Sequence, residues 1–195
     1  MRNIFSAMAV LIFCSAHPVL AQTIWTVDNA HSKIGFTVTH LVVAEVDGSF
    51  KEYNGQIVTT QPDFSDAKIE FTVNVASIFT ANEMRDNHLK GDDFFNAGKY
   101  PEMTFKSTSF NKTNDSKYVL EGSLTIRGIT KNVSFDVTYG GMIKDPLGNT
   151  KTGFKATTTI DRFDYDLKWN SLTEAGGAVV GRDVKIILKL EFQKQ

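Results

Sequence analysis

The chain has 195 residues, of which 21 are basic and 22 are acidic, so its formal net charge is −1. This balance gives no strong basic field, and we expect no binding to nucleic acid. The single cysteine, Cys14, lies in the leader described next, so the rest of the chain has no thiol for a disulfide, a nucleophile or a metal site.

The N-terminus has the features of a cleavable secretory signal peptide. An early arginine and an apolar run over residues 7–14 precede a small residue, Ala21. The run is too short to cross a bilayer, which takes about 20 residues, so we expect no stable membrane insertion. Cys14 makes a lipoprotein the competing interpretation, but the residue before it is bulky where a small one is expected. The sequence predicts a signal peptide over 1–21 and one periplasmic domain over 22–195.

Most of the remaining chain alternates apolar and polar residues, the pattern of half-buried strands. The clearest runs lie at residues 34–40, 50–58, 67–75, 103–109, 118–126, 133–139, 152–160 and 180–192. Short links between them favour antiparallel pairing. About eight such strands close into a barrel whose interior holds side chains or one small ligand. A two-sheet sandwich fits the alternation equally well.

Several positions predict where these strands bend or end. Gly55 predicts a bulge in the second run, and the polar residues 111–116 predict a loop. Arg127-Gly128 predicts a tight hairpin turn. The segment 145–148, with proline second and glycine fourth, fits a type I turn.

The segment from Ile78 to Pro101 does not alternate like a strand. Thr80 and Glu83 have the spacing of a capping box, and Gly91 suits the left-handed residue that often ends a helix. These signals predict a helix over 81–90.

This helix is too short to be stable alone, so its apolar side must be buried against the strands. Phe79 and Met84 have the spacing of a hydrophobic staple. We expect Met84, Leu89, Phe94 and Phe95 to form the buried side, which makes the segment a plug or lid at one end of the barrel.

No catalytic or metal motif follows from spacing. Arg85 and His88 share a helix face, whereas Asp86 and His88 are two residues apart and do not face each other. His31, His40 and His88 have no metal-ligand spacing. We therefore predict no catalytic residues, no metal and no cofactor.

The aromatic residues are more informative. Phe36, Phe71, Phe105, Phe135 and Phe154 each lie on the apolar side of a different predicted strand. An ordinary packed core explains this pattern, and so does a cavity lined by these rings with the helical segment over its mouth. A lined cavity would favour a long apolar ligand with a few polar groups fixing its head.

Four segments carry a resemblance to a known family: HSKIGFTVTHL, FTANEMRDNHLKGDDFF, KYPEMTFKSTSF and GSLTIRGITKNVSF. In this order, the chain resembles the YceI-like family of bacterial exported polyisoprenoid-binding proteins. The resemblance implies an all-β, eight-stranded antiparallel lipocalin-like barrel with a short helical insert near one end. It also implies a lipid or isoprenoid chain held inside, a periplasmic location and no catalytic residues.

The chain departs from the family pattern at two places. Family members commonly carry Phe-Gly after an Arg-x-Asp motif, whereas Arg162-Phe163-Asp164 is followed here by Tyr165-Asp166. The glycine that often follows the threonine of the insert is Ala81 here. These departures leave the chain length and headgroup of the ligand open.

The predicted function is a non-catalytic periplasmic protein that holds a polyisoprenoid or another long-chain amphiphilic lipid for transport or storage. An enzyme acting on an isoprenoid or quinone-like lipid, and a structural module with a filled core, remain the alternatives, and a homodimer is left open. The predicted ligand-binding residues are Phe36, Val38, His40, Phe71, Val73, Arg85, His88, Phe95, Phe105, Leu124, Ile126, Phe135 and Phe154. Of these, His40, Arg85 and His88 are the candidates for contact with a headgroup.

Overall fold

The computed structural model describes residues 21–172 and 176–195. The predicted signal peptide, apart from Ala21, lies outside the described residues. The strands are β1 (Thr23–Val27), β2 (Lys33–His40), β3 (Ala44–Phe50), β4 (Tyr53–Thr59), β5 (Lys68–Asn74), β6 (Ile78–Phe79), β7 (Glu102–Asn114), β8 (Lys117–Ile126), β9 (Ile129–Lys144), β10 (Thr150–Asp161) and β11 (Val180–Lys194). The helices are η1 (Val75–Ser77), α1 (Glu83–Lys90) and η2 (Arg162–Tyr165). No helix in the described ranges has the length and apolar character needed to cross a membrane.

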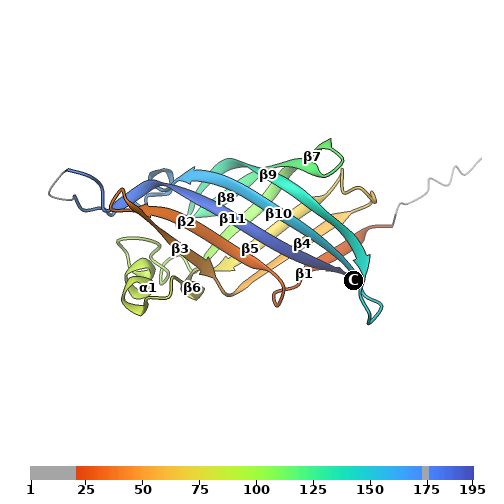
Figure 1. Cartoon of the computed structure of the whole chain (residues 1–195), viewed down its shortest axis with the longest axis horizontal. Helices are drawn as coiled ribbons and strands as arrows, with labels where there is room; N and C mark the ends of the chain where they lie inside the picture. Colours follow the sequence, from red (N-terminus) through yellow and green to blue (C-terminus); the bar gives the residue numbers. More distant parts are fainter. Residues whose placement is uncertain (1–20, 173–175) are drawn as a thin grey trace, which may run out of the picture.

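The strands form one closed antiparallel sheet (Figure 1). β11 pairs with β1 through its last residues and with β2 through its earlier ones. β4 pairs with β1, and β3 pairs with β2. β1 and β2 together therefore fill one strand position of the barrel, and β3 and β4 together fill the next. The predicted eight-stranded antiparallel barrel is confirmed, and the sandwich alternative is wrong.

Some strand boundaries differ from the prediction. The run 50–58 is broken at residues 51–52, and a separate strand, β3, precedes the break. β3 was missed because the apolar side of its alternation begins with the small residues Ala44, Val46 and Gly48, which give a weak signal. β7 continues to Asn114 through most of the predicted loop at 111–116.

Gly55 does not form the predicted bulge. The register of β4 against β5 is continuous, with Gly55 opposite Phe71. The register shifts of the barrel lie elsewhere, for example between Ser107 and Ser109 of β7. Glycine at position 55 therefore has a packing role, which is described with the site below.

Aromatic rings fill one end of the barrel. Phe64, in the link between β4 and β5, is only 1% exposed. Its ring lies 5.5 Å from that of Trp25, 5.9 Å from Tyr139 and 5.3 Å from Phe154, measured between centroids. Such tilted and edge-to-face contacts are favourable beyond the area they bury. This end is sealed.

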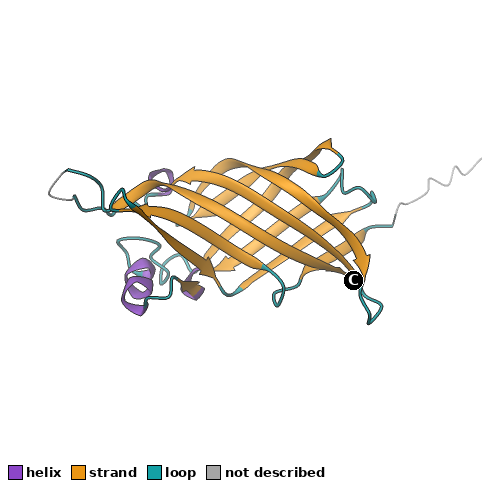
Figure 2. Cartoon of the chain, in the orientation of Figure 1, coloured by secondary structure: helices purple, strands orange, loops and turns teal. Residues whose placement is uncertain are grey.

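The helix α1 lies at the opposite end of the barrel from the C-terminus, beside β6 and β3 (Figures 1 and 2). Leu89, Phe94 and Phe95 pack against the core, as predicted. Met84 and Phe79 do not, because they are 84% and 46% exposed. The predicted hydrophobic staple is therefore wrong.

The predicted capping box is also wrong. The helix begins at Glu83, and the side chain of Asn82 accepts a hydrogen bond from the Arg85 amide. Thr80 instead donates from its amide and its hydroxyl to the buried carboxylate of Asp86, over 2.8 and 2.6 Å. The prediction failed because the backbone turns sharply at Ala81, which puts Thr80 outside the helix.

Two of the positions at which the family pattern has glycine take up left-handed backbone conformations. Ala81 has φ 59°, and Asp166 has φ 59°. Gly91, by contrast, ends the helix with φ −69°, so the predicted left-handed end at this residue is wrong. A side chain at positive φ costs free energy that glycine avoids.

Replacing Ala81 by glycine should therefore stabilise the protein, by about 1 kcal/mol, because the left-handed backbone is kept without its steric penalty. Chemical denaturation of the wild type and of Ala81→Gly measures this difference. Ala76→Gly is the control: Ala76 has an ordinary backbone conformation, so added flexibility should lower stability there. A loss of stability in Ala81→Gly would contradict the assignment of strain to this residue.

Candidate functional site

The barrel encloses an apolar cavity of about 190 Å³. Its wall is made by inward-facing residues of most strands, together with Leu89, Phe94 and Phe95 of the helical segment. Thr104 and Arg162 are the residues of this wall that have polar side chains. Because the lining residues extend from Phe154 to Leu89 and Phe95, the cavity runs from the aromatic end of the barrel toward the end that carries α1.

Several inward side chains are incompletely buried although they point into the barrel. Phe36, Phe71, Phe105, Ile186 and Leu188 belong to this group, and each contributes to the cavity wall. Their remaining accessible surface faces the interior, because alternate residues of a strand point to the same side. The interior is thus only partly filled, unlike a core packed at crystal density.

Glycines on neighbouring strands explain how the space stays open. A Cβ atom added to Gly48 would come closer than 3.0 Å to the ring of Phe36, and one added to Gly55 would do the same with Phe71. Gly122 stands in the same relation to Phe105. Each ring therefore lies flat over a glycine instead of projecting toward the barrel axis. The two interpretations of the phenylalanines, a packed core and a lined cavity, therefore both hold in part, since the rings pack against the glycines and still leave a cavity.

Ten of the thirteen residues predicted to bind ligand line this cavity. They are Phe36, Val38, Phe71, Val73, Phe95, Phe105, Leu124, Ile126, Phe135 and Phe154. Ligand contact by these residues remains a prediction. Sequence reasoning did not select Arg162, Leu167 or the inward residues of β11, although the alternation of β11 had identified which of its residues share a face.

The three polar candidates are not among the described residues that line the cavity. Arg85 donates to the hydroxyl and the carbonyl oxygen of Thr80, each over 2.7 Å. His40 Nδ1 lies 3.1 Å from the carbonyl oxygen of Val179. His88 Nε2 lies 2.9 Å from Asp93 Oδ2. These contacts use the three side chains to hold loops, so the geometry does not support the predicted headgroup contacts.

His88 also belongs to a second group of rings at the α1 end. Its ring lies 5.0 Å from those of Phe94 and Trp169, edge to face in both cases. Phe94 and Trp169 lie 5.3 Å apart. The helical segment is thereby attached to the chain that follows η2.

Two arginines hold the same end of the barrel by donating to backbone carbonyls. Arg127, in the turn between β8 and β9, donates from Nη1 to the carbonyl oxygens of Phe94 (2.6 Å) and Asp166 (3.1 Å). Arg162 is 3% exposed and holds the segment after η2 against the start of β11. Burial lowers the pKa of the Arg162 guanidinium, whereas the charge of Asp161 raises it.

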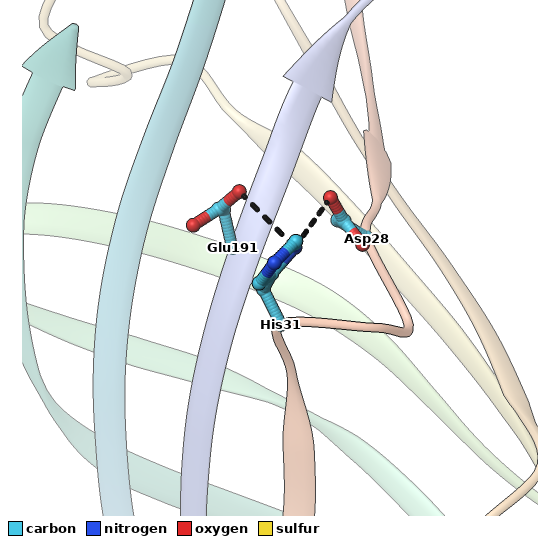
Figure 3. Close-up of side chains that lie close together, drawn as sticks. All are labelled: Asp28, His31 and Glu191. Atoms are coloured by element: carbon cyan, nitrogen blue, oxygen red, sulfur yellow. Dashed lines mark hydrogen bonds and ion pairs between the residues drawn. The ribbon is translucent and has the colours of Figure 1, made fainter. Parts of the chain in front are cut away.

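A polar cluster outside the barrel brings together Asp28, His31 and Glu191 (Figure 3). Their oxygen and nitrogen atoms lie within 4.8 Å of one another, a spacing at which three such groups can hold a metal ion. Lys151 already places its ammonium there, 2.7 Å from Asp28 Oδ2 and 3.5 Å from Glu191 Oε1. We therefore interpret the cluster as an ion-pair network that joins the β1–β2 turn to β10 and β11.

The cavity and the fold together define a class of protein, namely a closed antiparallel barrel with one internal apolar site, as in the lipocalin-like ligand-binding barrels. Comparison with known families gives the particular family. The YceI-like domain matches residues 25–192. The chain belongs to the YceI-like family, which confirms the resemblance carried by its motifs.

Individual relatives agree with this result. A UPF0312 protein of Staphylococcus aureus is 41% identical over 172 residues, covering 88% of this chain and 98% of that protein. The Campylobacter jejuni YceI protein is 34% identical with a TM-score of 0.69, over 86% of this chain and 96% of the other. A polyisoprenoid-binding domain from Saccharophagus degradans shares the fold, with a TM-score of 0.64 at 14% identity, over 91% and 100% of the two chains.

Adding a methyl group at Gly48 should close part of the cavity. In Gly48→Ala the ring of Phe36 has to swing inward, because the new Cβ atom takes its place. We expect a crystal structure to show the displaced ring, and uptake of a neutral apolar dye such as Nile red to fall at least several-fold. Gly98→Ala is the matched control, because nothing lies within 4 Å of a Cβ atom at Gly98. An unmoved ring with unchanged uptake would refute this account of the cavity.

The cluster around His31 predicts a pH dependence. The hydrogen bond and charge of Asp28, with the charge of Glu191, raise the pKa of His31 above 6.5. A raised folded-state pKa stabilises the fold fully below the unfolded pKa, and this contribution is lost as the pH rises through the folded value. An NMR titration should give His31 a midpoint above 6.5 that falls in Asp28→Asn. A midpoint unchanged by that substitution would show that Asp28 is not its cause.

Proposed function

We propose that this protein is a non-catalytic periplasmic binding protein that holds a polyisoprenoid or another long-chain lipid in its barrel cavity, for transport or storage. The observation that carries the proposal is the incompletely filled cavity, whose surface among the described residues is almost wholly apolar. The shared fold with a polyisoprenoid-binding domain and the membership of the YceI-like family support it.

Burial of hydrocarbon supplies enough free energy for such a ligand. Each CH₂ group withdrawn from water contributes roughly 0.8 kcal/mol. Ordering one ligand costs about 4–15 kcal/mol. A chain of about 20 carbons that is buried along its whole length contributes about 16 kcal/mol, which exceeds that cost, whereas a chain of about five carbons contributes only about 4 kcal/mol.

The size of the cavity bears on how a long chain enters. An apolar cavity of about 150 Å³ takes up benzene, so the 190 Å³ here receives the end of a chain without rearrangement. Pockets for larger ligands occupy about 300–1,000 Å³. The rest of a long chain therefore needs room beyond the 190 Å³ of this cavity.

The chemistry of the wall supports binding over catalysis. The described residues that line the cavity include no carboxylate, imidazole or thiol that could act as a general base, and their one hydroxyl belongs to Thr104, an exposed residue. The ion-pair network of Asp28, His31 and Glu191 is not part of this wall. An enzymatic role would need groups that the wall does not supply.

Extraction of the protein from the exported fraction tests the proposal. Native mass spectrometry should show a bound species of discrete mass that organic solvent releases, on a chain that begins at Gln22 after removal of the leader. Ala156→Phe, which fills the cavity from within, should carry much less of it. Lys155→Phe is the control on the outer face of the same strand, since Lys155 is exposed. A wild type that stays empty after incubation with isoprenoids and fatty acids would favour the structural module instead.

A further inference from the structure

The turn between β2 and β3 exposes three successive apolar residues. Leu41, Val42 and Val43 are 41%, 67% and 87% exposed. This turn projects at the end of the barrel that carries α1, at the left of Figure 1. The Leu41 amide donates to the carbonyl oxygen of Val179 (3.0 Å), which fixes the turn beside the chain that leads into β11. Single exposed apolar residues are common on protein surfaces, whereas a run of three at one tip marks a contact site.

The backbone of this turn is strained. Leu41 has φ 51° and Val42 has φ 67°, and the Val43 amide donates to the carbonyl oxygen of His40 (3.3 Å) to close the turn. A hairpin turn with positive φ at both central residues normally has Asn-Gly there, and a β-branched residue in that conformation is an outlier. Strain of this kind is typical of functional sites. Both residues are unfavourable for folding, so we look for their benefit in a contact outside the chain.

The apolar surface of the turn continues into the cavity. Val38 of β2 and Val180 of β11 line the cavity, and Val180 lies opposite His40, the last residue before the turn. A further exposed apolar residue, Leu172, lies on the segment before β11 and is bridged to Ala178, two residues before Val180. The apolar wall of the cavity and the exposed apolar residues are therefore neighbours at this end.

The chemistry of this end fits a lipid bilayer better than a protein. Even a large aromatic side chain buries only about 150–250 Å², so four aliphatic residues fall short of the roughly 800 Å² per partner of a stable protein interface. A bilayer needs no such area, because it surrounds each side chain that enters it. The described residues within 40–45 and 169–181 include one carboxylate, that of Glu45, and no lysine or arginine. Such a surface has no attraction for anionic headgroups.

We propose that the apolar tip, Leu41–Val43, inserts reversibly into the surface of a lipid bilayer with neutral headgroups. This proposal rests on the proposed function and deepens it. A ligand chain then passes from the bilayer along Val38 and Val180 into the cavity without crossing water, which would oppose its transfer. Three aliphatic side chains bury far less apolar surface than a helix that spans the bilayer, so the contact is transient.

Sedimentation with phosphatidylcholine vesicles tests the contact. The wild type should sediment with the vesicles, and added phosphatidylglycerol should not raise the bound fraction. In the double variant Leu41→Asn, Val42→Gly the partition coefficient should fall at least about tenfold, because most of the inserted apolar surface is lost. Its resistance to chemical denaturation should rise, because Asn-Gly fits the turn. A merely structural role of these residues would not lower vesicle binding while raising stability.

A second pair of variants is matched for exposure. Val43 and Leu147 are both 87% exposed. Leu147 belongs to the turn between β9 and β10, which lies beside the C-terminus at the opposite end of the barrel (Figure 1). Val43→Asn should lower vesicle binding several-fold, whereas Leu147→Asn should leave it unchanged. An equal loss in both variants would show that binding follows general surface hydrophobicity, and the proposal would be wrong.

Transfer of a lipid probe connects the tip to the cavity. Vesicles that contain geranylgeraniol, an isoprenoid alcohol, are mixed with the protein and removed at set times. Mass spectrometry then gives the amount of the alcohol on the protein. The double variant should take up the alcohol several-fold more slowly than the wild type and reach the same final occupancy, because its cavity is unchanged.

The outcomes separate the two proposals. If the wild type carries lipid but does not bind vesicles, or if the double variant binds them equally well, the tip proposal is wrong and the lipid-binding function stands. If the wild type neither binds vesicles nor takes up the alcohol, both are wrong. A dimer of the wild type that the double variant does not form would also overturn the tip proposal, because the tip would then be a contact between copies of this chain.

Discussion

The contact between inward phenylalanine rings and glycines of the next strand decides whether this barrel has a core or a cavity. An eight-stranded barrel is just wide enough for side chains to fill it. Rings such as those of Phe36 and Phe71 would close the interior if they pointed along the radius. Because Gly48 and Gly55 give each ring a flat surface to lie on, the rings become part of the wall. Part of the apolar surface of the rings therefore stays unburied, and a ligand that covered it would gain the free energy of that burial.

The two ends of the barrel are built from different interactions. Rings around Phe64 seal one end by apolar contact. The other end has a smaller group of rings, His88, Phe94 and Trp169. It also has polar contacts, in which Arg127 and Arg162 donate to carbonyl groups of the loops and Thr80 donates to Asp86. Contacts of this kind are individually worth less than the packing of a large aromatic cluster. Of the two ends, the α1 end is therefore the one that we propose for entry of a lipid chain.

Alternation along the strands predicted an antiparallel β fold and most of the cavity wall, whereas the choice of a barrel over a sandwich came from the family resemblance. Residues such as Phe105 and Leu124 point inward because of a local rule, and that rule does not depend on which strands pair. Contacts between distant segments follow no such rule. His31 and Glu191 meet only because β1, β2 and β11 are neighbours, and Arg162 reaches the cavity only because the chain after η2 folds back onto β11. The predicted headgroup role of Arg85 lost support for the same reason, since helical spacing does not show that the side chain turns back to Thr80.

The residues that depart from the family pattern lie in the segments next to α1 and η2, not in the cavity wall. Ala81 and Asp166 have side chains at positive φ, and Tyr165 replaces a phenylalanine with a buried hydroxyl that has no hydrogen-bond partner among the described residues. None of the three lines the cavity. Asp166 recovers part of its cost through its ion pair with Lys168 at 2.8 Å. Ala81 and Tyr165 show no comparable gain, and both lie in segments at the α1 end. The cost of these residues therefore falls on the α1 end, and the apolar wall of the cavity is unaffected.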